Sequence, residues 1–375
     1  MKVLNIITGG LNADGITNAW LTFAEELKSN KSYDDVVIDF AKIEGLSNDT
    51  VTQRFHQLGI STPKLPARLN APLKYFRSLT KLLKHGKYDI IHANGSSSLL
   101  FIEMFAGLCA RTPVRIAHSR NTTCSYKLLH YLLKIPFYLS CNGRLSCGLD
   151  AGKWLFGAQK FTILKNGKNF SKFKFDDKIR EKKRNELQLS NTLAIGHVGK
   201  FNTQKNHKFL IEIFKELHQL NPNTKLFLIG DGELQHDIEE LVKKYNLHNC
   251  VKFTGAITNI PEFLNAMDIM VFPSLFEGLP NVVLEWQAMG LPCLISDTIT
   301  RECAPSSLVE FKGLDKSPYE WIISINNLSK YNNRKTQSQE GIKALKDSKF
   351  DIKDSTHILI DTYKTLLSKK TNRFR

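Results

Sequence analysis

The chain of 375 residues is long enough for two domains of ordinary size, and its 42% apolar content is sufficient for two hydrophobic cores. No stretch reaches the ~18 apolar residues of a membrane-spanning helix, and the seven cysteines include no Cys-x-x-Cys pair, which favours reduced thiols in a cytoplasmic protein. The net charge of +16 is concentrated in residues 51–175, where 20 lysines and arginines face only three acidic residues. We therefore expect an anionic partner for this segment. Because no nucleic-acid-binding motif accompanies it, an anionic membrane surface fits better than nucleic acid.

The first half alternates short apolar runs with helical patterns. Val3 to Thr8 predicts a buried strand that ends in a glycine-rich turn around Gly10, and a helix follows from about Ile16. A strand, a glycine-rich turn and a helix in this order allow the backbone of the turn to approach a phosphate, although the glycine spacing is not that of a dinucleotide site. Further strands are predicted at residues 36–40, 89–94, 115–120 and 144–148. The alternation indicates a doubly wound α/β domain.

Two basic segments of this domain are candidates for contact with lipid. Residues 72–84 have apolar side chains at helical spacing and lysines and arginines on the other side. This pattern fits an interfacial helix on anionic lipid and, equally well, a surface helix packed on the sheet. Residues 54–68 combine apolar and basic side chains, and we expect them to form a mobile loop that could meet a lipid acceptor.

Polar residues follow two of the predicted strands in this half. His118 lies with Ser119, Arg120 and Asn121 at the end of the strand predicted from residue 115. A later strand closes on Asn166 and a glycine. Because ligands bind at the carboxyl ends of the strands in such a sheet, His118 is a site candidate.

The second half shows the same alternation of predicted strands and helices. A buried strand at residues 193–199 leads into a segment with Lys200 and Lys205 before the next helix, and the following strands end at Gly230 and Gly255.

The most informative stretch is residues 272–285, Phe-Pro-Ser-Leu-Phe-Glu-Gly-Leu-Pro-Asn-Val-Val-Leu-Glu. A buried strand stops at Pro273, Glu277 lies on the loop that follows, and a helix that contains Glu285 starts near Asn281. The backbone N–H groups at the start of this helix are free to face an anion.

This stretch resembles the Glu-x7-Glu signature of retaining family-4 glycosyltransferases. That family has the GT-B fold, an α/β architecture of two Rossmann-like doubly wound domains that face each other across a cleft. The resemblance implies that Glu277 lies against the donor sugar and that Glu285 binds the nucleotide ribose. It also implies that the residues between them hold the diphosphate: Gly278, Leu279, Pro280 and Asn281.

The resemblance gives roles to the other candidates as well. His118 matches a histidine that meets the donor sugar, in a motif where Arg120 replaces a second histidine and could contact an acceptor phosphate. Lys205 and Lys200 match the basic pair at the diphosphate, with Lys200 where arginine is usual. The implied catalytic residues are therefore Glu277, His118 and Lys205. The remaining donor contacts are Gly10, Asn166, Gly230 and Gly255.

On this resemblance the chain is a retaining hexosyltransferase that needs no metal or other cofactor, and it contains no Asp-x-Asp motif. The donor is a nucleotide sugar, with UDP favoured by its frequency in the family. The acceptor is a lipid-linked saccharide in capsule, exopolysaccharide or O-antigen synthesis, at the inner face of the plasma membrane. We expect an acceptor domain at residues 1–165, a nucleotide-sugar domain at 166–354, and a helix at 355–375 that packs back on the first domain.

Three alternatives remain on the sequence alone. A protein of this fold can bind a nucleotide sugar without catalysis, and it can hydrolyse or epimerise one. The few acidic residues of the basic segment disfavour an epimerase. A nucleic-acid-binding protein of two α/β domains is disfavoured by the lack of a reading motif.

Overall fold

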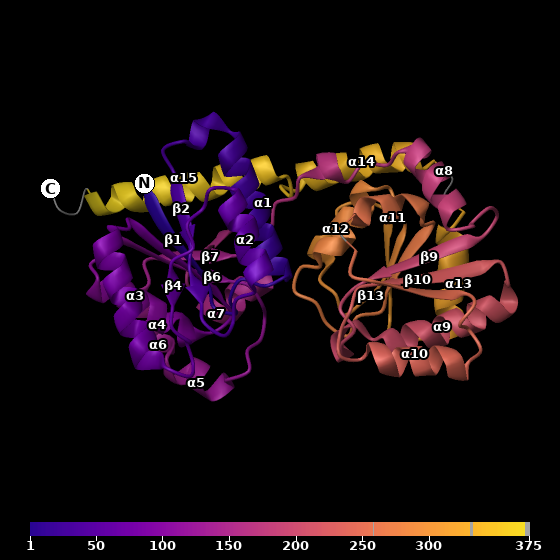
Figure 1. The fold of residues 1–375 in the computed structure, drawn as a ribbon, viewed down its shortest axis with the longest axis horizontal. Coiled ribbons are helices and arrows are strands. Elements are labelled where there is room, and N and C mark those ends of the chain that lie inside the picture. The colour runs from indigo at the N-terminus through magenta and orange to yellow at the C-terminus, as the bar shows by residue number, and fades with distance from the viewer. Residues whose placement is uncertain (258, 331–332, 372–375) are drawn as a thin grey trace. The chain divides into compact units, whose positions relative to one another are not determined.

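The computed structural model describes residues 1–257, 259–330 and 333–371, and the chain divides into two compact α/β units (Figure 1). Unit 1 comprises Met1–Lys168 and the chain from Lys349 onward, and unit 2 comprises Asn169–Ser348. The boundaries predicted after residue 165 and before residue 355 therefore move to 168 and 349. The reason is a backbone connection within unit 1: Lys168 N donates to Phe350 O at 2.8 Å, and Ile352 N donates to Lys168 O at 3.0 Å.

Unit 1 is built on a parallel six-stranded sheet in the order β2-β1-β5-β6-β7-β8. Its strands are β1 (Lys2–Ile7), β2 (Val37–Phe40), β5 (Ile90–Gly95), β6 (Val114–Ser119), β7 (Gly143–Ser146) and β8 (Thr162–Ile163). The order reverses between β1 and β5, and the carboxyl ends of strands at such a point form a ligand crevice. A separate pair, β3 (Lys42–Ile43) and β4 (Lys64–Leu65), has no counterpart in the prediction.

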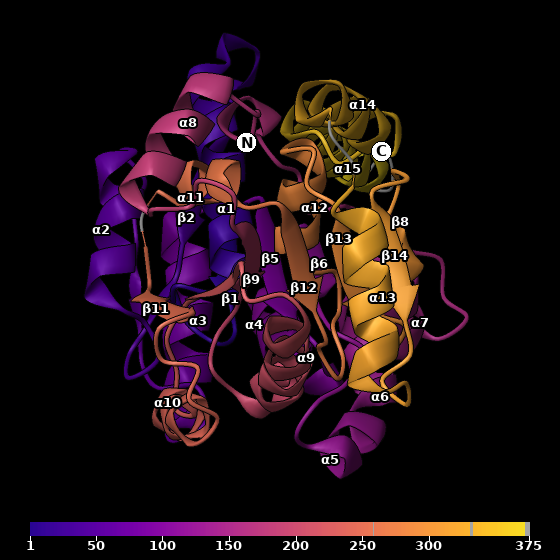
Figure 2. The same ribbon diagram turned by 90° about the vertical axis from the view of Figure 1, so that its right-hand side faces the viewer.

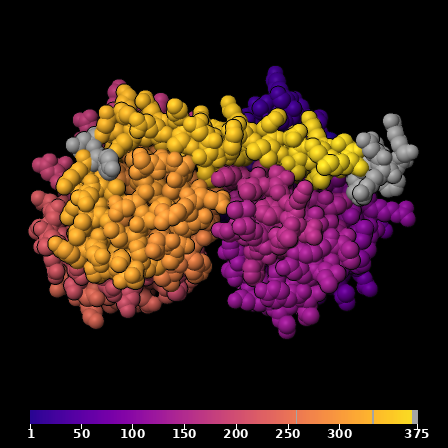
Figure 3. All heavy atoms as spheres, turned by 180° about the vertical axis from the view of Figure 1, so that it is seen from behind, coloured from indigo at the N-terminus to yellow at the C-terminus, as the bar shows by residue number. Residues whose placement is uncertain are grey.

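Helices cover both faces of this sheet. On one face α1 (Gly15–Ser29) and α15 (Ile352–Thr371) contribute Trp20 and Tyr363 to a hydrophobic core. On the other face α3 (Pro72–Gly86), α4 (Phe101–Cys109) and α6 (Lys134–Ser140) contribute Tyr75 and Phe137 to a second core. The remaining helices are α2 (Asp49–Gln57), α5 (Lys127–Leu132) and α7 (Leu149–Phe156). Figure 3 shows α15 in yellow as it runs along unit 1.

The structure corrects the prediction for one of the two segments proposed for lipid contact and agrees with one of the two readings of the other. Residues 54–68 are not a loose loop, because Phe55 is fully buried against Phe40 and Arg68 forms a buried ion pair with Glu103 at 2.6 Å. Helix α3 buries Tyr75, Leu79 and Leu83 and leaves its lysines in water. It is thus a surface helix packed on the sheet, the second of the two readings of residues 72–84.

Unit 2 has a second parallel six-stranded sheet in the order β11-β10-β9-β12-β13-β14. Its strands are β9 (Leu193–Val198), β10 (Thr224–Ile229), β11 (Val251–Gly255), β12 (Ile269–Phe272), β13 (Cys293–Ser296) and β14 (Val309–Lys312). Figure 2 shows β9, β12 and β13 side by side. The order reverses between β9 and β12, so the loops after these two strands mark the ligand position expected for this topology.

Helices lie on both faces of the second sheet (Figure 1). One layer contains α9 (His207–Leu220), α10 (Gln235–Lys244) and α13 (Pro318–Leu328), whose apolar sides form one core with the strands. The other contains α8 (Asp177–Glu186), α11 (Ile260–Ala266), α12 (Asn281–Ala288) and α14 (Arg334–Asp347). Short 3-10 turns occur at Lys31–Tyr33, Ser98–Leu100, Phe170–Lys172, Thr203–Lys205 and Arg301–Cys303. No helix among the described residues is long and apolar enough to cross a membrane.

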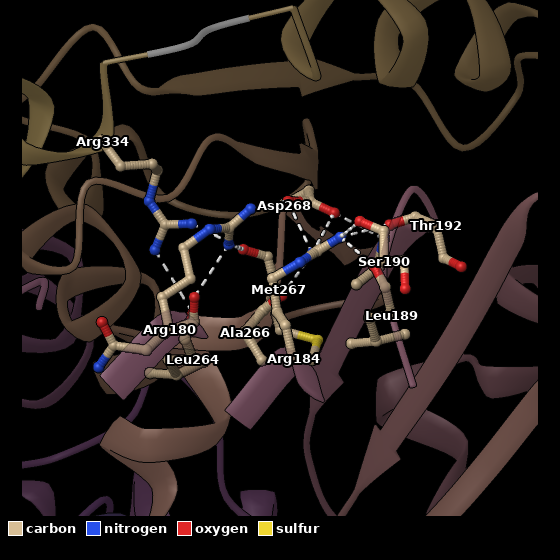
Figure 4. A network of polar contacts seen from close by, with 12 residues as sticks. Arg180, Arg184, Leu189, Ser190, Thr192, Leu264, Ala266, Met267, Asp268 and Arg334 are labelled. Atoms are coloured by element: carbon tan, nitrogen blue, oxygen red, sulfur yellow. Dashed lines mark hydrogen bonds and ion pairs between the residues drawn. The ribbon is translucent and has the colours of Figure 1, made fainter. Parts of the chain in front are cut away.

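A network of arginines fixes the start of β12 (Figure 4). Asp268, the residue before this strand, accepts hydrogen bonds from Arg180 Nη2 at 2.5 Å and from Arg184 Nη1 at 3.0 Å. Arg334 donates to the carbonyl oxygen of Met267 at 2.6 Å, and burial lowers the pKa of Arg334 to about 9. Because β12 leads directly into the loop with Glu277, this network determines where that loop begins.

Candidate active site

Two loops of unit 2 meet at the point where the strand order reverses. Lys205 ends the 3-10 turn after β9, and Glu277 lies on the loop after β12. The Lys205 Nζ lies 2.6 Å from Glu277 Oε1, and the two side chains are only 15% and 9% exposed. The same Nζ lies 4.6 Å from the centre of the Phe272 ring. The structure therefore brings together two of the three residues predicted to be catalytic.

Backbone and amide hydrogen bonds hold these two loops against each other. Leu275 N donates to Gln204 O at 2.8 Å, and Gln204 Nε2 donates to Phe276 O at 2.9 Å. Asn206 has a left-handed backbone with φ of 54° and donates from Nδ2 to Pro273 O at 3.2 Å. The ion pair thus lies on a rigid support, as a binding site requires.

Helix α12 starts directly after this loop and has an open N-terminus. No side chain caps it, and its first turn contains no acidic residue, so its backbone N–H groups are suited to an anion. Glu285 is the fifth residue of α12 and is buried. Three buried polar atoms around this turn lack a hydrogen-bond partner in the described structure: Ser274 Oγ, Asn281 Oδ1 and Trp286 Nε1. Unsatisfied buried groups of this kind are expected where a polar ligand or water binds.

The loops after β9 and β10 approach each other at glycines. Gly230 has φ of +142°, and a Cβ at this position would lie 2.1 Å from the carbonyl oxygen of Gly199. Gly230 N donates to Gly255 O at 3.0 Å. Lys200 takes a different direction from Lys205, because its Nζ lies 3.5 Å from Glu233 Oε2 and both side chains are more than 60% exposed. The structure thus does not bring Lys200 to the ion pair.

A pair of buried histidines beside this site was missed. His197 donates from Nδ1 to Val271 O at 2.9 Å, and its Nε2 has no partner in the described structure. Both ring nitrogens of His207 also lack a partner, and the two ring centres are 4.6 Å apart. Burial lowers the pKa of His207 to about 4, and it places that of His197 well below its usual value. No spacing motif links these two positions, so nothing in the sequence distinguished them from core residues.

In unit 1, a buried arginine connects three strand ends. Arg120 donates from Nε and Nη2 to Asn94 Oδ1 at 2.9 and 2.8 Å, and from Nη1 to Asn166 Oδ1 at 2.7 Å. Burial lowers the pKa of Arg120 to about 10, so the group is still charged at neutral pH. None of these hydrogen-bond partners is a carboxylate, so the guanidinium of Arg120 remains able to attract an incoming anion. Gly10 lies in a tight turn of the same unit, with φ of +82°.

His118 ends a chain of three buried side chains in unit 1. The Tyr363 Oη on α15 lies 2.7 Å from His92 Nδ1, and His92 Nε2 lies 3.0 Å from His118 Nδ1. Burial, together with the charge of Arg120, holds the pKa of both histidines well below 6.5. Both imidazoles are therefore neutral, and each carries one proton.

The hydrogen-bond partners determine which ring nitrogen of each histidine carries the proton. The Tyr363 hydroxyl is fully buried and its hydrogen-bond partner in the described structure is His92, so it donates to Nδ1 rather than leave its proton unpaired. His92 then carries its proton on Nε2 and donates to His118 Nδ1, and His118 carries its own proton on Nε2. That Nε2 is buried and has no partner in the described structure. His118 is thus a hydrogen-bond donor available to a ligand oxygen.

The sequence contained a partial signal for this chain of side chains. His92 and Asn94 are alternate residues of an otherwise apolar strand, and they point to the same face at its carboxyl end. Two polar residues at the end of an apolar strand are as clear a sign of a site as the polar cluster at the end of β6. Tyr363 gave no comparable signal, because it lies 271 positions from His92 and looks like an ordinary core residue of a helix.

Comparison with known proteins agrees with this geometry. Residues 179–302 match the family described as glycosyl transferases group 1. EpsF of Bacillus subtilis, a candidate glycosyltransferase by name, is 32% identical over 80% of this chain and 82% of its own length. The Escherichia coli UDP-Gal:alpha-D-GlcNAc-diphosphoundecaprenol alpha-1,3-galactosyltransferase is 28% identical over 82% of this chain and 80% of its own. Anabaena HepE, solved in complex with UDP-glucose, covers 97% of this chain and 100% of its own with a TM-score of 0.80 and 16% identity.

Two doubly wound units of this topology define the GT-B class of glycosyltransferases, and the predicted fold class is confirmed. The chain belongs to the group 1 glycosyltransferases. It is thus a glycosyltransferase, as predicted from the stretch around Glu277.

Proposed function

We propose that this enzyme is a retaining, metal-independent glycosyltransferase of family 4. It transfers a sugar from a UDP-sugar to a lipid-linked saccharide during synthesis of a cell-surface polysaccharide, at the inner face of the plasma membrane. The observation that carries the proposal is the largely buried Lys205–Glu277 pair at the reversal point of the second sheet. A buried ion pair of this kind is costly to form. Its position at the ligand crevice therefore indicates a role in binding a ligand and not only in stability.

The residues of this site match the charges that the reaction develops. Cleavage of the bond between sugar and phosphate leaves negative charge on the diphosphate, which Lys205 and the open N-terminus of α12 would stabilise. Glu277 would orient hydroxyl groups of the sugar, and Glu285 would bind the ribose. The role proposed for His118 is donation from Nε2 to an oxygen of the sugar. The acceptor proton would leave with the diphosphate, as in same-face attack.

The relatives support the finer parts of the proposal. The name of the Escherichia coli relative specifies a UDP-galactose donor, an acceptor linked to undecaprenol through a diphosphate, and an α linkage. An α product from a UDP-hexose, whose own anomeric bond is α, means retention. The name of a Staphylococcus aureus relative, 28% identical over 59% of this chain, assigns it to capsular polysaccharide biosynthesis.

A thermal-shift screen tests the donor directly. We expect one UDP-sugar to raise the melting temperature with or without EDTA, because a ligand at about 100 times its Kd stabilises the native state by about 2.7 kcal/mol. Lys205→Met should remove most of that shift and Lys200→Met should keep most of it, since only Lys205 contacts Glu277. A shift that EDTA abolishes would contradict metal independence. No shift with any nucleotide sugar would contradict the proposed donor site.

The proton assignment of the histidine chain predicts the effect of Tyr363→Phe. Without the Tyr363 hydroxyl, His92 Nδ1 no longer accepts a hydrogen bond that keeps its proton on Nε2, and the fixed tautomer of His118 should give way to a mixture. We expect ¹⁵N NMR to show this change at His118 and the kcat for sugar transfer to fall by ~10-fold, as for other residues that orient a functional histidine. Tyr138→Phe, which removes a hydroxyl bonded to Leu155 O in the same unit, is the control and should change neither. An unchanged His118 tautomer in Tyr363→Phe would refute the assignment.

A further inference from the structure

The outer surface of α5 and α6 carries an unusual number of large apolar side chains. Leu128, Tyr131, Leu132, Ile135 and Leu139, here called the α5–α6 ridge, are each between 59% and 79% exposed. Four of them follow the spacing of a single helical face across the short break between the two helices: Leu128, Leu132, Ile135 and Leu139. A soluble monomer seldom exposes such a contiguous apolar stripe unless it is an interaction site.

The ridge is held in place from within. His130 is buried, stacks on Trp154 with ring centres 4.8 Å apart, and accepts from Ser98 N at 3.1 Å. Phe137 is fully buried against Phe156. The outward apolar side chains therefore belong to packed helices and not to a segment that could turn them inward.

The segment that carries the ridge is strongly basic, although α7, whose Trp154 stacks on His130, has the exposed Asp150 in its first turn. Between Ile90 and Leu149 the sole acidic residue is Glu103, which is buried and paired with Arg68. Lys127 is exposed on α5, and Lys134 lies over the Tyr131 ring at 6.0 Å. Helices α3, α4 and α6 pack side by side, so the exposed basic side chains of α3 belong to the same helical layer: Lys74, Arg77, Lys81 and Lys84.

We propose that the α5–α6 ridge inserts into an anionic lipid bilayer while the basic side chains of this layer bind the headgroups. An apolar stripe with flanking lysines and a tyrosine is the pattern of a helix that lies in the membrane interface. Acidic lipid supplies the negative charge that a predominantly basic face attracts. A second copy of this chain would instead bring two positive faces together, which disfavours self-association. The proposal rests on the proposed function, because a lipid-linked acceptor lies in such a bilayer.

Vesicle sedimentation of the full chain tests the ridge. We expect binding to vesicles of phosphatidylglycerol mixed with phosphatidylcholine and little binding to phosphatidylcholine alone. Leu132→Ser/Leu139→Ser should weaken the binding by more than about tenfold, because each leucine contributes apolar area to the bilayer. The control Leu220→Ser/Tyr319→Ser changes two similarly exposed apolar residues of unit 2 and should bind like the wild type.

Two further measurements separate this proposal from the proposed function. The ridge variant should keep the donor-induced thermal shift and its transfer rate to a short-chain, water-soluble acceptor. If no nucleotide sugar raises the melting temperature of the wild type, the proposed donor site is contradicted, and the vesicle result is unaffected. Equal vesicle binding by the ridge variant and the wild type would overturn the proposal. So would a wild-type dimer that the ridge variant converts to a monomer while vesicle binding is absent.

Discussion

Lys205→Met is expected to lower the kcat for sugar transfer by roughly 10²–10³-fold, the usual loss when one preorganised donor to a developing anion is removed. It should also destabilise unit 2 by about 3–5 kcal/mol, because Glu277 would remain as a largely buried charge without its partner at 2.6 Å. Urea unfolding and a transfer assay with the donor identified by thermal shift measure the two effects.

A double variant separates the two contributions. In Lys205→Met/Glu277→Gln neither charge remains, so we expect most of the lost stability to return while transfer stays impaired. The single variant Glu277→Gln should lose transfer as well, since it removes the carboxylate proposed to orient the sugar. If the double variant is no more stable than Lys205→Met, the two side chains are not coupled and the ion pair is not the organising feature of the site.

Asp268→Asn is expected to produce the second large effect, a loss of about 3–5 kcal/mol in the unfolding free energy. The carboxylate accepts from Arg180 and Arg184, and it also accepts from the backbone N–H of Ala194 at 2.8 Å. With the negative charge removed, two partly buried arginines beside the buried Arg334 lose their counter-charge. Urea or thermal unfolding measures the change.

An exposed carboxylate of unit 2 provides the comparison. Asp315 lies in the same unit and pairs with Lys316 at 3.7 Å, but its side chain is 77% exposed, so Asp315→Asn should not change the unfolding midpoint measurably. Equal midpoints for Asp268→Asn and the wild type would show that hydrogen bonds to carbonyl oxygens, and not the charge of Asp268, hold the arginines. Because Asp268 precedes β12, we also expect a higher KM for the donor in the Asp268 variant.

The strands and the loop with Glu277 could be predicted because their signals are local. An apolar run, a proline, two turn-forming residues and a helical pattern follow one another within residues 268–288, and the structure places β12, the loop and α12 there. The approach of Lys205 to Glu277 was predictable in outline, since both follow strands of one parallel sheet. Its distance and burial were not, because they depend on the hydrogen bonds between the two loops.

The features that escaped prediction depend on contacts between distant parts of the chain. Arg68 looks like a free basic residue in the sequence, but Glu103 and the Leu99 carbonyl oxygen bind it in the interior. The outward face of α5 and α6 could not be recognised either, because the segment is apolar on all sides. In such a helix periodicity does not say which residues the fold buries.

The division of unit 1 into two separate stretches of chain has a consequence for biosynthesis. Unit 2 is continuous, so a ribosome delivers all of it before residues 349–371 emerge. During that time the hydrophobic core that α1 forms on one face of the first sheet stays incomplete, because α15 supplies Leu359, Ile360 and Tyr363 to it. His92 likewise has no hydroxyl partner until Tyr363 arrives. The nascent chain should therefore be most prone to aggregation, and most dependent on chaperones, in the interval before its last helix is made.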